Sequence, residues 1–108
     1  MKQLLLIGLL LLLIAPSAFA QEVNGDIETG RVISYTCSGC HGIPDYNNVY
    51  PTFRVPKVAG QNSLYIVNAL NAYKAGTRKH PTMQIQAESL SDDDIKNIAV
   101  YFASLGQE

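Results

Sequence analysis

The residues best suited to chemistry in this 108-residue chain lie in one short segment, Cys37-Ser38-Gly39-Cys40-His41. Paired cysteines outside the cytosol form structural disulfides by default, and a C-x-x-C pair is redox-active in thioredoxin-like proteins, where a strand of an α/β fold precedes it. A zinc site would need a second pair of ligands, but after this motif only His80 remains as a Cys or His ligand. The histidine directly after the second thiol favours a different chemistry.

The pattern C-x-x-C-H is typical of covalent haem attachment. Two thiols at this spacing reach the two vinyl groups on one edge of the porphyrin and add across them, which gives two thioether bonds. The adjacent histidine then lies on one face of the ring and supplies a nitrogen to the iron. We therefore predict one haem c, held by Cys37, Cys40 and His41.

The first twenty residues have the pattern of an export signal. Lys2 gives a positive start, Leu4 to Ile14 is almost wholly apolar, and Ala18-Phe19-Ala20 fits a signal-peptidase site. An uncleaved membrane anchor is the alternative, although a span needs about 20 apolar residues. We expect residues 1–20 to be a cleaved signal peptide and residues 21–108 to form one periplasmic domain.

The short length of the domain suggests that its hydrophobic core alone is not enough to stabilise it. Residues 21–108 are few for a self-sufficient hydrophobic core, and chains of this size often use a disulfide, a metal or a cofactor. The whole chain has eight Lys and Arg against nine Asp and Glu, and no basic face suggests nucleic acid. Basic residues gather in the middle of the domain and acidic residues near its ends, which we interpret as solvated surface.

Hydrophobic periodicity predicts an all-α domain with helices over residues 26–36, 63–75 and 91–105. The last has the clearest signals, because Ile95, Ile98, Ala99 and Phe102 follow helical spacing and Ser91 with Asp94 resembles a capping box. Residues 41–62 are rich in Pro, Gly and Asn and predict a long loop. Such a loop is uncommon in a small domain unless it is functional, as it would be when wrapped on a cofactor.

From about Asp26 to Leu105 the chain resembles the bacterial class I cytochromes c. The landmarks, in chain order, are Gly30, Cys37-Ser38-Gly39-Cys40-His41-Gly42, Pro56-Lys57-Val58-Ala59-Gly60-Gln61, Met83 and Tyr101-Phe102-Ala103. The resemblance implies three main helices and loops wrapped around one covalent haem, with the first and last helices crossing where Gly30 packs on Tyr101. Ile43-Pro44-Asp45-Tyr46 departs from the family's small glycine turn, so the shape of that loop stays open.

The resemblance implies Met83 as the second axial ligand, in a loop before the last helix, and Met/His ligation raises the reduction potential. With Met1 removed, Met83 is the only methionine of residues 21–108. Three alternatives remain: Met83 as a plain core residue, His80 as a second histidine ligand, or an open sixth position that binds a gas or peroxide. We expect His41 and Met83 to hold the iron.

Two further assignments stay open. Arg78 either pairs with a haem propionate or is an exposed cation near a helix C-terminus. The carbonyl of Pro44, Pro51 or Pro56 could accept a hydrogen bond from the second nitrogen of His41 and fix the ring, and the sequence does not choose among them.

The expected function is single-electron transfer, without a catalytic centre or a small-molecule substrate. A monomer would dock transiently, as redox encounters do, on periplasmic redox proteins or membrane respiratory complexes. The alternatives are a dedicated haem subunit of a periplasmic oxidoreductase complex, or a haem-based sensor or peroxidase with an open sixth site.

Overall fold

The computed structural model describes residues 21–48 and 53–106; the predicted signal peptide, residues 1–20, and Pro51 lie outside the described residues. The described chain forms five helices: α2 (Ile27–Ile33), α3 (Tyr35–His41), α4 (Ser63–Ala75), α5 (Pro81–Glu88) and α6 (Asp92–Ser104). An isolated antiparallel bridge joins Asn47 to Arg54, and residues 21–48 and 53–106 contain no β-strand. The all-α prediction is confirmed.

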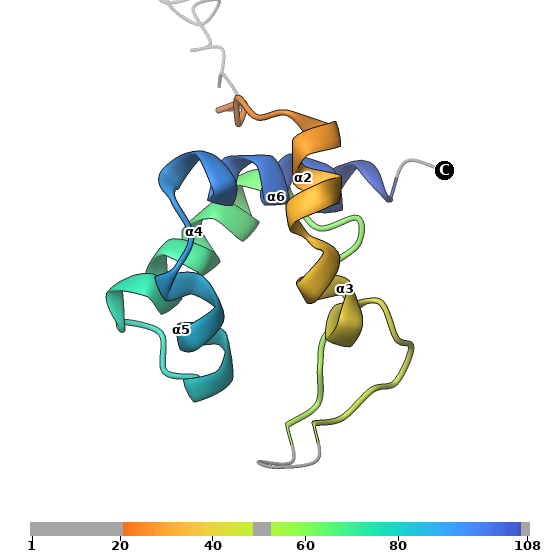
Figure 1. Cartoon of the computed structure of the whole chain (residues 1–108), viewed down its shortest axis with the longest axis vertical. Helices are drawn as coiled ribbons and strands as arrows, with labels where there is room; N and C mark the ends of the chain where they lie inside the picture. Colours follow the sequence, from red (N-terminus) through yellow and green to blue (C-terminus); the bar gives the residue numbers. More distant parts are fainter. Residues whose placement is uncertain (1–20, 49–52, 107–108) are drawn as a thin grey trace, which may run out of the picture.

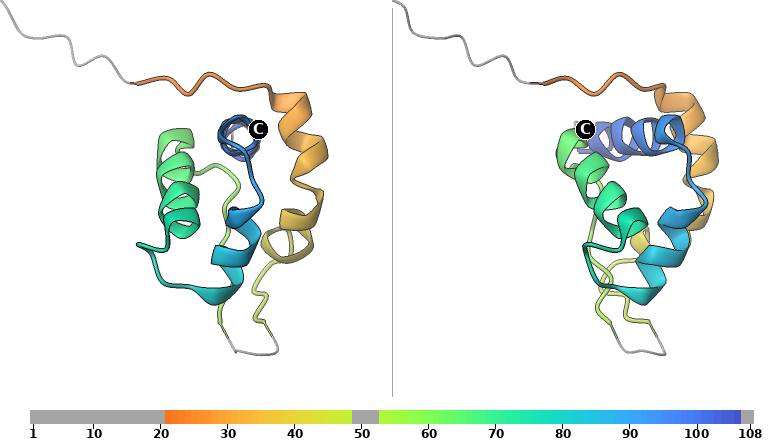
Figure 2. Two further views of the ribbon diagram at one scale, coloured as in Figure 1. Left: turned by 60° about the vertical axis from the view of Figure 1, so that its left-hand side comes forward. Right: turned by 90° about the vertical axis from the view of Figure 1, so that its left-hand side faces the viewer.

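Helix α6 is the centre of the fold. It packs against α2 on one side and α4 on the other, and α5 packs against α4. Both views of Figure 2 agree with this order, with α6 between the other two helices. In Figure 1 the α2–α3 arm and the α4–α5 arm descend from the two sides of α6, so α3 and α5 face each other below it.

The buried apolar side chains form a thin core around α6. The predicted stripe of Ile95, Ile98, Ala99 and Phe102 is buried and meets Ile66 and Leu70 of α4 and Ala87 of α5. Other apolar side chains are only partly buried against this cluster: Ile33, Cys37, Val58, Val67, Tyr73, Met83, Leu90 and Tyr101. Four of these side chains, Cys37, Val58, Tyr73 and Met83, also line a pocket beside the core.

The helix predicted over residues 26–36 is two helices. Asp26 caps α2 as expected, since its Oδ1 accepts the N–H of Thr29 at 2.6 Å. At Ser34 the backbone leaves helical geometry, with ψ near 3°. The chain then re-enters a helix, and α3 carries the whole haem-attachment motif from Cys37 to His41.

The crossing of α2 and α6 depends on Gly30. A Cβ at this position would overlap the backbone carbonyl of Asn97 and lie 2.8 Å from Cβ of Tyr101. Beside it, the N–H of Asp26 donates to Oδ1 of Asn97 at 2.7 Å. The predicted packing of Gly30 on Tyr101 is confirmed, and only a glycine permits this closeness.

The segment that contains Met83 is helical, which corrects the prediction that Met83 lies in a loop. Helix α5 begins with Pro81 in its first turn, after His80 as the N-cap. A proline at the first helical position has no N–H to leave unpaired and holds a φ that suits the helix. Pro81 therefore starts a helix in the stretch where a loop was predicted.

The ends of α4 and α6 follow the sequence signals. Asn62 caps α4 by accepting the N–H of Tyr65 at 3.1 Å, and Gly76 ends it with φ 75°. At α6 the capping box is complete: Ser91 Oγ accepts the N–H of Asp94 at 3.0 Å, and Asp94 Oδ2 accepts the N–H of Ser91 at 2.9 Å. None of the described helices combines the length and apolar character needed to cross a membrane.

We expect Gly30→Ala to lower the free energy of unfolding by about 1–3 kcal/mol, the usual cost of forcing an extra carbon into a packed contact. Thr29→Ala is the matched control, because Thr29 precedes Gly30 on the same helix and its side chain is exposed. Denaturant titration measures both variants. Equal stabilities for the two would show that the crossing tolerates a side chain.

We expect Asp94→Asn to destabilise the protein in a pH-dependent way. Hydrogen bonds from the backbone and side chain of Ser91 lower the pKa of Asp94 below its ordinary value of 3.8. The ionised group therefore stabilises the fold fully above pH 3.8, and this contribution disappears as the pH falls through the lowered value. Denaturant midpoints of wild type and Asp94→Asn should differ near neutral pH and converge in acid; a constant difference would contradict the cap.

Candidate haem site

A hollow lies between α3, α4 and α5, against the core. Its larger part has a volume of about 380 Å³, and a second part of about 100 Å³ shares several of its walls. Ligand pockets usually measure about 300–1,000 Å³, so the larger part alone is within the range of a binding site. Residues that line it come from all three helices and from α6, among them Cys37, His41, Tyr65, Ile66, Leu70, Met83, Ile98 and Phe102.

The two cysteines project into this hollow from α3. They lie three residues apart, a spacing that puts both side chains on one face of a helix, and both are half-buried free thiols. Burial, the largest cause, raises the pKa of the Cys37 thiol. The motif is on a helix, and the described residues have no strand before it, so the structure gives no support to a thioredoxin-like pair.

His41 is the last residue of α3, and its ring is fixed by one hydrogen bond. Nδ1 lies 2.8 Å from the carbonyl oxygen of Pro56. Of the three prolines that the sequence offered as partners of His41, the structure thus places Pro56 at the ring. Since a carbonyl only accepts, Nδ1 donates this hydrogen bond, and in the neutral form of the ring Nε2 keeps a free lone pair. This is the tautomer a metal ligand needs.

The segment that carries Pro56 is itself held against α6. The N–H of Gly60 donates to the carbonyl of Phe102 at 2.9 Å. Gly60 has φ 81°, and a Cβ there would lie 3.1 Å from Cα of Gly106. Two glycines thus let this backbone lie directly on the end of α6, which fixes the far end of the Pro56 segment.

Met83 borders the same hollow from the other arm. Its side chain projects from α5, is partly buried, and packs against the core cluster. Both parts of the hollow have Met83 and His41 among their walls. The structure therefore brings together Cys37, Cys40, His41 and Met83, the residues the sequence singled out.

His80 also borders the hollow, but one of its nitrogens is occupied. Its Nδ1 accepts the backbone N–H of Met83 at 3.3 Å, which caps α5. Its ring packs on Phe53, with centroids 4.5 Å apart, and edge-on to Tyr73 at 6.2 Å. The imidazole thus has a structural role within the described residues.

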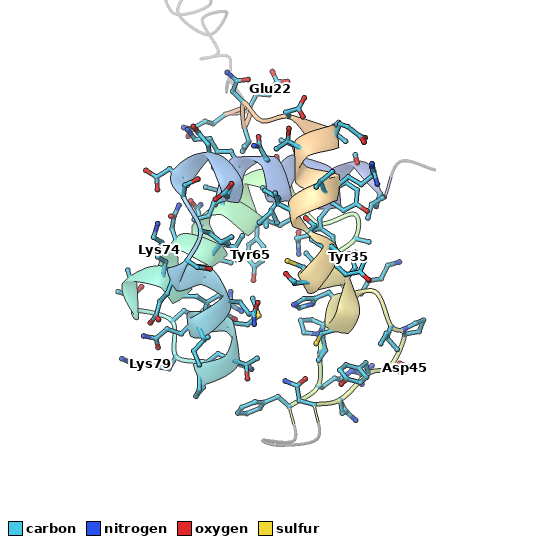
Figure 3. The ribbon with its side chains drawn as sticks, in the orientation of Figure 1. Glu22, Tyr35, Asp45, Tyr65, Lys74 and Lys79 are labelled. Atoms are coloured by element: carbon cyan, nitrogen blue, oxygen red, sulfur yellow. The ribbon has the colours of Figure 1, made fainter. Side chains whose placement is uncertain are left out.

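Arg78 stands at the wall of the larger part of the hollow, with two tyrosines of α4. Its Nη1 donates to the hydroxyl of Tyr65 at 3.4 Å, and its Cζ lies 4.8 Å from the centre of the Tyr73 ring. In Figure 3 Tyr65 lies on the side of α4 that faces α3, whereas Lys74 and Lys79 lie on the outer edge of this arm. Tyr65 and Tyr73 are eight residues apart on α4, a spacing that puts both on the same side of the helix, and both line the hollow.

The chemistry of these residues fits haem c. Two thiols on one helix face suit two thioether bonds, an imidazole that donates through Nδ1 leaves Nε2 for iron, and the walls are largely apolar. By contrast, the described residues contain no group of three or more His, Cys, Asp or Glu side chains that could hold a metal ion by themselves. A zinc knuckle finds no support there.

Comparison with known proteins also points to a cytochrome c. No protein-family model matches the chain. Cytochrome c-554(548) of Halomonas halodenitrificans is 36% identical over 83 residues, which are 74% of this chain and 96% of that protein. Cytochrome c4 of Stutzerimonas stutzeri is 38% identical over 89 residues, and the thiosulfate dehydrogenase electron acceptor of the same species, strain A1501, is 39% identical over 75.

The lengths of these relatives differ. The match covers 74% of this chain but only 41% of the cytochrome c4, and 67% of this chain but 33% of the electron acceptor. The match to cytochrome c-554(548), in contrast, takes in nearly all of that protein. With the helical fold and the donor set of the hollow, these similarities establish that the chain belongs to the bacterial class I cytochromes c, electron-transfer proteins with covalently bound haem c.

Proposed function

We propose that this protein passes single electrons in the periplasm with its iron held by His41 and Met83 and its haem linked to Cys37 and Cys40. The observation that carries the proposal is that an imidazole with a free Nε2 and a thioether border one apolar hollow from opposite arms of the fold. The first comes from α3 and the second from α5.

Met83 is favoured over His80 as the second ligand for two reasons. His80 Nδ1 accepts the N–H of Met83, so the proton of its neutral ring lies on Nε2 and, unlike in His41, neither nitrogen keeps a free lone pair; its ring also packs between Phe53 and Tyr73. The side chain of Met83, in contrast, packs against the core cluster and lines the hollow. Methionine and histidine together are a ligand set of haem electron carriers.

In this proposal the protein contributes position and environment. The bound haem supplies the one-electron chemistry. Pro56 orients His41, and buried side chains such as Ile98 and Phe102 exclude water from the wall. Arg78, supported by Tyr65 and Tyr73, places a positive charge at this wall, where it would pair with a propionate.

The proposal extends to location and partners. We propose that residues 1–20 direct export and are removed, and that residues 21–108 are the working domain, a monomer. Partners would be periplasmic redox proteins or membrane respiratory complexes, bound by weak and transient contacts. The similarity to a protein named as an electron acceptor of thiosulfate dehydrogenase supports this kind of exchange.

We expect Met83→Ala to leave the haem attached but to open the iron. The purified protein is followed by absorption spectroscopy when oxidised, when reduced, and when reduced under carbon monoxide. Wild type should have the ferric methionine–iron absorption band and no response to carbon monoxide, and Met83→Ala should lose the band and bind the gas. Its reduction potential should fall, since Met/His ligation raises it.

Ile85→Ala is the control, because Ile85 lies on the same helix but is 67% exposed. It should behave like wild type. Binding of carbon monoxide to wild type would favour the sensor or peroxidase alternative. Identical behaviour of Met83→Ala and wild type would mean that another group is the ligand.

We expect Cys40→Ser to retain at most one thioether bond and to give much less haem-loaded protein in cells that assemble exported cytochromes c. Intact-mass spectrometry measures the covalent haem and the loss of residues 1–20 together. Wild type should have the mass of residues 21–108 plus one haem. A Cys40→Ser yield and haem content equal to wild type would refute the attachment site, and co-purification of a stoichiometric partner would favour the subunit alternative.

A further inference from the structure

The N-cap of α5 is unusual in its residue type. Asn, Asp, Ser and Thr are the preferred N-caps, but here the cap is His80, whose Nδ1 accepts the N–H of Met83 at 3.3 Å. Met83 is the third residue of α5, the position whose N–H an N-cap side chain normally accepts. The imidazole therefore holds the backbone of the residue that we propose as the iron ligand.

The ring of His80 is fixed in turn by two aromatic neighbours. Phe53 packs on it with centroids 4.5 Å apart, and Tyr73 of α4 meets it edge-on at 6.2 Å. Phe53 belongs to the segment that leads to Pro56, the partner of His41. An asparagine could cap the helix but could not fill this place between two rings, which gives a physical reason for a histidine here.

We propose that His80 is a positioning residue for Met83: its capping hydrogen bond holds the start of α5, and with it the methionine, against the hollow. This inference rests on the proposed role of Met83. It assigns His80 no bond to the iron. When the cap is lost, the first turn of α5 gains freedom, and a competing external ligand displaces Met83 more easily.

The test uses the ferric, haem-loaded protein and imidazole as the external ligand, titrated at about pH 8, where free histidine is neutral. The series is His80→Ala, which removes cap and ring, His80→Phe, which keeps a ring without an acceptor, and His80→Asn, which keeps an acceptor without the ring. Met83→Ala is the reference for an open iron. The readouts are the Kd for imidazole and the methionine–iron absorption band.

We expect His80→Ala and His80→Phe to bind imidazole about fivefold to tenfold more tightly than wild type, the change that loss of a typical cap predicts. His80→Asn should return the affinity to near the wild-type value. Every His80 variant should keep the methionine–iron band before imidazole is added. This rescue by a smaller capping residue is something that a purely packing role would not produce.

Other outcomes would overturn the inference in distinguishable ways. If Met83→Ala binds imidazole more tightly and all His80 variants match wild type, the cap has no positioning role and the proposed function stands. If His80→Phe matches wild type while His80→Asn does not, ring packing rather than the hydrogen bond holds Met83. If Met83→Ala binds imidazole no more tightly than wild type, the ligand assignment itself fails, and the role of His80 fails with it.

Discussion

The structure depends on the close crossing of α2 and α6 at Gly30. Because Gly30 has no side chain, the backbone carbonyl of Asn97 and Cβ of Tyr101 lie directly against it. The crossing fixes α2, and through the short break at Ser34 it fixes α3, which carries both cysteines and His41. One contact between residues far apart in sequence thus sets the whole His41 side of the site.

The other side of the hollow is fixed independently. Helix α4 packs on α6, α5 packs on α4, and the cap at His80 begins the helix that holds Met83. The two arms meet below α6 through the segment of Phe53 and Pro56, which contacts His80 on one arm and His41 on the other. The axial ligands that we propose are therefore held by separate arms, linked by one segment of irregular backbone.

The sequence predicted those features that depend on local chemistry. The capping box of Ser91 and Asp94, the buried stripe of α6 and the attachment motif are each encoded within a few residues. It missed features that depend on tertiary contacts or on an ambiguous signal: Pro81 starts a helix where a loop was expected, and the choice of Pro56 as the partner of His41 required the fold. The contacts of Arg78 with Tyr65 and Tyr73 likewise required the fold, because residues on a helix face do not reveal what they face.

The crossing at Gly30 also decides where additional chain can be joined. Since the first and last helices of the domain touch, the backbone enters before α2 and leaves after α6 at the same end of the molecule, away from the hollow between α3 and α5 (Figure 1). Chain joined before α2 or after α6 would thus start from the α2–α6 end of the domain, on the far side of α6 from α5. The fold is thus suited to use as a module, either alone or joined to another domain in a longer chain.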